Sequence, residues 1–124
     1  MTETLTFAAF RAGPGGQIAH RIGIPISQCA RWDDAQHAFS RLFSGDAEEA
    51  DAAMRRVRDA IAVMSTGEKA VAYALLHALD YSRQADEFSG GGMWRTLDYV
   101  SGNHRRAIIA AILRQDGAEE ANRG

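Results

Sequence analysis

The spacing of apolar residues in residues 46–64 constrains the fold more than any other feature. This spacing places one apolar face on an α-helix, because the helix completes a turn every 3.6 residues. Acidic residues near the start and arginines nearer the end agree with the helix dipole. We therefore predict an amphipathic helix packed on a core. Its apolar residues recur in steps of four and three at Ala50, Met54, Val57, Ile61 and Met64.

A second helix is predicted directly after this one. The residues "STGE" at 65–68 have the capping-box form, in which Ser65 accepts from the backbone N–H of Glu68 and Glu68 reaches back. The helix is expected to cover 66–81. Apolar residues occupy more than half of its circumference, so we expect it to be central. These residues are Val71, Ala72, Leu75, Leu76 and Leu79.

Glycine-rich breaks separate the remaining predicted elements. Residues 4–12 allow a helix or a strand, and "GPGG" at 13–16 is expected to break the chain. The sequence thus predicts an all-α, compact single-domain bundle of five or six helices, with a polar, frayed tail at 117–124. The other predicted helices cover 17–22, 25–43, 93–100 and 104–115.

The composition limits the classes of function. The chain has 124 residues, which suits one domain, and its net charge of −2 argues against a general binder of polyanions. The single cysteine, Cys29, excludes an internal disulfide and fits a reducing compartment. We see no signal peptide and no apolar run of about 20 residues, so we expect a cytoplasmic protein without membrane contact.

Positive charge is concentrated near the N-terminus. Residues 1–32 carry three arginines against one glutamate, whereas residues 33–64 carry four arginines against seven acidic residues. Residues 65–124 carry seven basic against eight acidic residues. Only the first of these segments is net positive, which is compatible with a nucleic-acid face.

The stretch "GGQIAHRIGIPISQCARW" at 15–32 has the spacing of a tight turn between two crossed helices. Ala19 is the small residue at the crossing, and Gly23 is the turn glycine, for which we predict a positive φ. Cys29 is the inward apolar position, and Trp32 packs beside it. Such spacings also occur at packed turns that bind no nucleic acid, so both interpretations stay open.

The same stretch resembles the helix-turn-helix of phage-repressor and Cro-like DNA-binding proteins, over residues 5–43. The resemblance implies a supporting helix at 17–22 and a recognition helix at 25–32. It also implies a DNA-binding portion at 1–43 and a helical bundle portion at 44–116 that dimerises. The residues implied to contact double-stranded DNA are Gln17, His20, Arg21, Ser27, Gln28 and Arg31.

Three features depart from the family's pattern. Cys29 replaces the usual valine or isoleucine, which is tolerable because a free cysteine behaves as a small hydrophobic residue. Pro25 stands where serine or threonine often caps the recognition helix. The "DDAQ" that follows Trp32 places two carboxylates near the expected phosphates, which they would repel.

The sequence indicates no catalytic residue, no metal site and no cofactor. No two of the four histidines have the four-residue spacing of a metal-binding helix face, and no second cysteine is present. We therefore expect a small non-enzymatic regulatory or accessory protein, with two alternatives. One is a DNA-binding regulator acting as a homodimer, as paired half-sites require. The other is a helical protein-interaction module, such as an adaptor, inhibitor or accessory subunit. The histidines are His20, His37, His77 and His104.

Overall fold

The computed structural model describes residues 6–89 and 102–114, where it contains helices and no strand. This confirms the all-α class. The predicted helix 93–100 and the predicted tail 117–124 lie outside the described residues. Seven α-helices and one 3₁₀ helix occur within the described ranges: α1 (Phe7–Ala12), α2 (Pro14–Arg21), η1 (Ile26–Gln28), α3 (Trp32–Arg41), α4 (Ala47–Ala62), α5 (Thr66–Ala78), α6 (Ser82–Ser89) and α8 (Gly102–Leu113).

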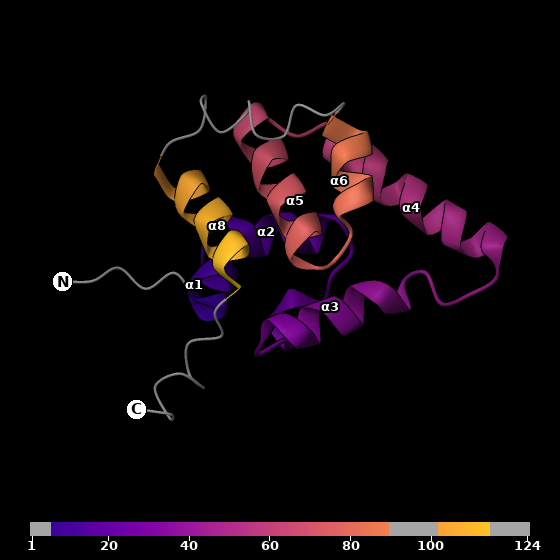
Figure 1. The fold of residues 1–124 in the computed structure, drawn as a ribbon, viewed down its shortest axis with the longest axis horizontal. Coiled ribbons are helices and arrows are strands. Elements are labelled where there is room, and N and C mark those ends of the chain that lie inside the picture. The colour runs from indigo at the N-terminus through magenta and orange to yellow at the C-terminus, as the bar shows by residue number, and fades with distance from the viewer. Residues whose placement is uncertain (1–5, 90–101, 115–124) are drawn as a thin grey trace.

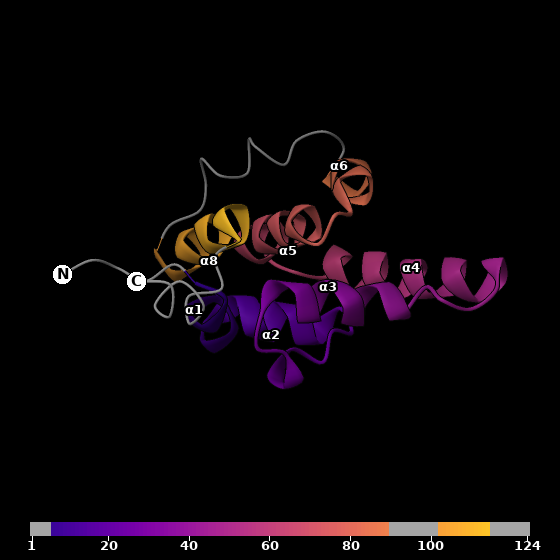
Figure 2. The ribbon, with the colours of Figure 1, turned by 60° about the horizontal axis from the view of Figure 1, so that its bottom comes forward.

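The helices lie in two layers, with α8, α5 and α6 over α1, α2 and α3 (Figure 2). Aromatic rings join elements of the fold. The Phe7 ring meets Trp32 edge-on with centroids 5.0 Å apart, and the Phe39 ring meets Tyr81 at 4.8 Å. Helix α4 extends sideways from these layers (Figures 1 and 2). None of the helices in the described ranges is long and apolar enough to cross a membrane.

Helix α5 is central, as predicted (Figure 1). It contacts α8, α6, α2 and α4, and its Leu75 and Leu76 have no exposed surface. The helix ends earlier than predicted, at Ala78, because Asp80 adopts a left-handed φ of 68° that no α-helix continues. A further helix, α6, which was not predicted, then begins at Ser82.

Side-chain hydrogen bonds cap the N-termini of α4 and α5. The Asp46 carboxylate accepts from the backbone N–H of Glu49 at 2.8 Å and so begins α4. The predicted capping box begins α5. The Ser65 hydroxyl accepts from the Glu68 N–H at 3.2 Å, and the Glu68 carboxylate accepts from the Ser65 N–H at 2.8 Å. Helix α4 is amphipathic as predicted, and it buries Ala53, Val57 and Ile61.

Residues 7–12 form α1, which settles the choice between helix and strand in favour of helix. The predicted break occurs at Gly13, between α1 and α2, but it is shorter than predicted, because Pro14 begins α2 and the next two glycines lie inside it. Proline suits a first helical position, since its missing N–H would have no partner there. A Cβ on Gly16 would collide with the carbonyl oxygen of Arg11, so α1 and α2 meet this closely only because the residue is glycine.

The predicted helix 25–43 is wrong in its first part. A single 3₁₀ turn, η1, is followed by Cys29 in an extended conformation, with φ −99° and ψ 139°. The guanidinium group of Arg11 donates to the carbonyl oxygen of Cys29 at 2.5 Å. That carbonyl therefore accepts a hydrogen bond from α1 and does not take part in the backbone hydrogen bonds of a continuous helix.

Helix α3 begins later than predicted, at Trp32. The Asp34 carboxylate accepts from the backbone N–H groups of Ala30 and Arg31, at 2.9 and 3.1 Å. A new helix start is stabilised in this way, because its first N–H groups have no partner within the helix. The predicted final helix, 104–115, corresponds to α8, which begins two residues earlier, at Gly102, and ends at Leu113, before Arg114 with its φ of 50°.

Candidate functional site

The turn after α2 has the packing that its sequence predicts. Gly23 has a φ of +99°, as expected for the turn glycine. The next residue, Ile24, donates its N–H to the carbonyl oxygen of Ala19 at 3.0 Å. Ala19, Cys29 and Trp32 are buried, so the small, apolar and aromatic positions all face inward.

The recognition helix predicted at 25–32 is wrong, since Ile26–Gln28 forms only a 3₁₀ turn and the next helix does not begin until Trp32. Ser27 and Gln28 lie in that turn and are exposed. Arg31 is also exposed, but it occupies the extended residue before α3 and pairs with Asp33 at 3.8 Å. These three residues therefore do not share one helical face.

A shallow groove of about 430 Å³ lies along α2 and η1, and we call it the α2 groove. It brings together four of the six predicted contact residues, whereas Gln28 and Arg31 are not among its lining residues. Arg11, which was not among the predicted contact residues, also lines it. Its position one helix before the motif gave no reason to select it. The lining residues are Arg11, Ala12, Gly13, Gly16, Gln17, His20, Arg21, Ile26 and Ser27.

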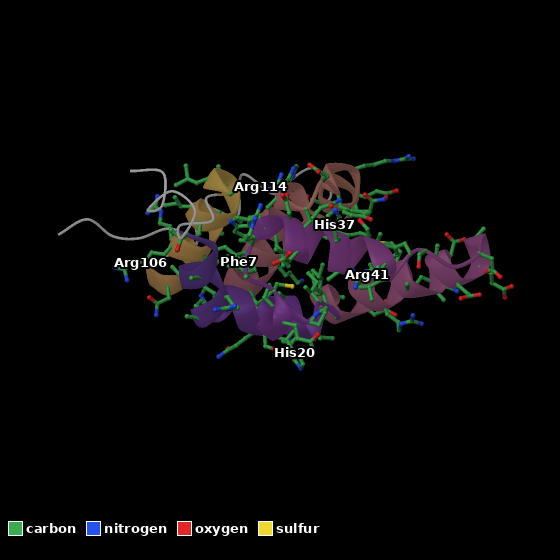
Figure 3. All side chains as sticks on the ribbon, turned by 90° about the horizontal axis from the view of Figure 1, so that it is seen from below. Phe7, His20, His37, Arg41, Arg106 and Arg114 are labelled. Atoms are coloured by element: carbon green, nitrogen blue, oxygen red, sulfur yellow. The ribbon has the colours of Figure 1, made fainter. Side chains whose placement is uncertain are left out.

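The rim of the α2 groove is basic and polar, and its floor is apolar. Arg11 and Arg21 supply guanidinium groups, and His20 is exposed on the outer side of α2 (Figure 3). The floor contains two glycines and the buried side chain of Ile26. Among residues 6–89 and 102–114, no carboxylate lines the groove. Such a surface suits a ligand that has negative charge beside an apolar group.

Contacts with neighbouring elements hold the two arginines of the groove. Arg11 donates to the Cys29 carbonyl, and Arg21 forms an ion pair with Glu68 of α5 at 3.1 Å. The backbone N–H of Ser65, with a smaller contribution from Arg21, holds the pKa of Glu68 below its ordinary value. Glu68 is therefore ionised at neutral pH and compensates part of the charge of Arg21.

The carboxylates of the "DDAQ" segment stabilise the start of α3. Hydrogen bonds from the backbone N–H groups of Ala30 and Arg31 lower the pKa of Asp34. Asp33 pairs with Arg31 and also, at 3.7 Å, with Arg114, the residue that follows α8. These contacts give both aspartates a structural role.

Cys29 is a free cysteine that is buried in the core. Burial raises the pKa of the Cys29 thiol, and the Asp34 carboxylate adds to this effect, so the thiol is protonated and packs as an apolar group. His20 and His37 lie on different helices and on different sides of the view in Figure 3. Within residues 6–89 and 102–114, no three His, Cys, Asp or Glu side chains form a group that could hold a metal ion.

Comparison of the chain with protein-family models, with curated proteins and with solved structures finds no match.

Proposed function

We propose that the chain is a small non-enzymatic accessory protein that binds a protein partner through the α2 groove. The partner segment is acidic and carries an apolar anchor. The observation that supports this proposal is the apolar floor of the groove inside a basic rim. An apolar anchor would pack on Ile26 and the glycines, and carboxylates beside it would face Arg11, His20 and Arg21. Complementary charge would give such a contact its specificity.

A protein partner agrees with the groove better than DNA does. Helix-turn-helix proteins read bases by laying a recognition helix in the major groove. Residues 25–31 offer only one 3₁₀ turn for that purpose, and the helix that follows begins with Asp33 and Asp34. Phosphate contacts alone would position a duplex without reading its sequence.

The proposal is tested by selecting binders from a displayed library of random peptides on the immobilised protein. We expect the selected sequences to combine aspartate or glutamate with aliphatic residues. The double variant Gln17→Glu, His20→Glu should weaken these peptides at least about tenfold, since it places carboxylates on the rim.

Helix α3 provides a matched control for this experiment. Gln36 and His37 are the same pair of residue types and do not line the groove. The double variant Gln36→Glu, His37→Glu should therefore leave peptide affinity within about twofold of wild type, because its added charges are screened by salt. Selection of peptides without acidic residues, or equal losses in both double variants, contradicts the proposal.

Double-stranded DNA is a second candidate for the same groove. Its support is the gathering of Gln17, His20, Arg21 and Ser27 in one lining, to which the described part of the chain adds no carboxylate. The test is titration of a fluorescent duplex of mixed sequence at several salt concentrations. If the groove binds DNA, the affinity should fall steeply as salt concentration rises, because binding releases counterions from the DNA. The double variant Gln17→Glu, His20→Glu should then lose this binding. No duplex binding at low salt rules out this candidate.

A further inference from the structure

A second groove, independent of the first, lies between α4 and α6, and we call it the α4 groove. Its volume is about 540 Å³. Met54 and Phe88 give it an apolar part, and both side chains are half-buried. Charged residues of both signs surround them. The lining residues are Glu48, Asp51, Met54, Arg55, Arg58, Glu87 and Phe88.

The charges that α4 contributes lie on one helical face in a fixed order. Glu48, Asp51, Arg55 and Arg58 are spaced by three, four and three residues, and this spacing gives a single stripe. All four are exposed. The N-terminal half of the stripe is acidic and the C-terminal half is basic.

This order of charges is complementary to itself when the helix direction is reversed. Glu48 and Arg58 lie five residues on either side of Ala53, and Asp51 and Arg55 lie two residues on either side. In two antiparallel copies of α4 crossing at the level of Ala53, each acidic residue would stand opposite an arginine. At about 1.5 Å per residue, the pairs would lie roughly 7.5 and 3 Å from the crossing point.

The placement of α4 leaves this face accessible to a second copy. Residues 47–52 contain no buried residue, and this end of the helix extends away from the other elements (Figures 1 and 2). Within the described residues the buried positions of α4 begin at Ala53. A second helix could therefore lie along α4 without displacing the core.

We propose that the α4 groove receives α4 of a second copy of the chain, in an antiparallel, two-fold symmetric dimer. Such an interface is isologous, so both copies use the same residues. Met54 lies four residues before Arg58, so it borders the charged stripe on one side of the helix. Contacts of Met54 and Phe88 supply apolar burial. The four exposed ion pairs fix the direction of the helices and contribute little affinity individually. The Arg58–Asp59 pair at 3.4 Å is itself exposed and can be exchanged for the new contact.

The experiment measures the mass of the chain by sedimentation equilibrium, from low micromolar to submillimolar concentration. Wild type should shift from 13.5 kDa towards twice that mass as concentration rises. The variant Arg55→Glu, Arg58→Glu has an entirely acidic stripe, and Glu48→Arg, Asp51→Arg has an entirely basic one. Each should raise the dimer dissociation constant at least about tenfold, because like charges then face each other.

An equimolar mixture of these two variants should form a heterodimer. This result separates interface disruption from misfolding, because both chains must be folded to restore the complex. The matched control is Glu49→Arg, Arg56→Glu, which reverses exposed charges of α4 that do not line the groove. It should dimerise like wild type.

Three outcomes would overturn the inference. One is a wild-type chain that stays monomeric throughout, whether or not another protein occupies the groove. Another is a dimer that survives both charge reversals. The third is a mixture of the two reversed variants that remains monomeric.

Discussion

Helix α5 and the segment of residues 22–31 are held in place in different ways. Burial of many side chains holds α5, since eight of its thirteen residues are buried against surrounding helices. The segment of residues 22–31 buries only four side chains, those of Ile22, Ile24, Ile26 and Cys29, and its shape depends on a few individual features. These are the positive φ of Gly23, the hydrogen bond from Ile24 to Ala19, and the hydrogen bond from Arg11 to Cys29. Single substitutions should therefore destabilise α5 strongly, whereas in the segment they should also change its shape.

The largest effect is expected in α5. Leu75→Ala removes a side chain with no exposed surface and should destabilise the fold by about 2–5 kcal/mol, because it loses apolar burial and leaves a cavity. Denaturant unfolding measures the change. A loss below about 1 kcal/mol would mean that α5 is not the centre of the core.

Gly23→Val should have the next largest effect, because a β-branched residue fits a φ of +99° badly. We expect a loss of about 1–3 kcal/mol, measured by the same unfolding experiment. Among the described residues, a Cβ at Gly23 would come within 4 Å of Leu42 alone, at an ordinary 3.5 Å, so the loss is attributed to backbone strain at the positive φ. Gly23→Asn should cost less, since asparagine tolerates positive φ. Equal losses for the two variants would argue against this cause.

Ser65→Ala should destabilise the fold by about 1 kcal/mol, the usual cost of removing an N-cap side chain. The hydroxyl accepts from the backbone N–H of Glu68 at 3.2 Å, and alanine leaves that donor to water. The measurement is the shift of the denaturant midpoint at unchanged slope. A midpoint equal to that of wild type would show that the cap contributes nothing to α5.

The smallest effect concerns pH. The pKa of Glu68 is lower in the folded chain than its ordinary value, so its carboxylate contributes stability above an unfolded pKa of about 4.3. That contribution is lost as pH falls through the folded pKa. The stability difference between wild type and Glu68→Gln should therefore shrink in acid. Unfolding experiments from neutral to acidic pH measure it, and a difference that is independent of pH contradicts the assignment.

Local chemistry explains which parts of the fold the sequence could predict. The capping box at Ser65, the amphipathic face of α4 and the positive φ of Gly23 each depend on residues close together in the chain. The segment before α3 could not be predicted in this way, because Arg11 reaches the Cys29 carbonyl across 18 residues. The start of α2 was missed for a similar reason, since the contact of Gly16 with α1 exists only in the folded chain.

The residues of the candidate site also divide into those that local spacing predicts and those that depend on contacts between distant segments. Gln17, His20 and Arg21 lie on one short helix, so their common surface follows from helical spacing. Gln28 and Arg31 were expected to continue that surface on a second helix, and the 3₁₀ turn followed by extended backbone removes them from the α2 groove. Arg11 joined the groove through the packing of α1 on α2, which no short motif expresses.

The central claim is that residues 25–31 form a packed turn and not a recognition helix. Backbone chemical shifts of the isotope-labelled protein test it residue by residue in solution. The structure predicts a brief helical signature at Ile26–Gln28, extended values at Cys29 and Arg31, and continuous helical values only from Trp32. Unbroken helical shifts from Pro25 through Arg41 would contradict this account and restore a helix that could enter the major groove.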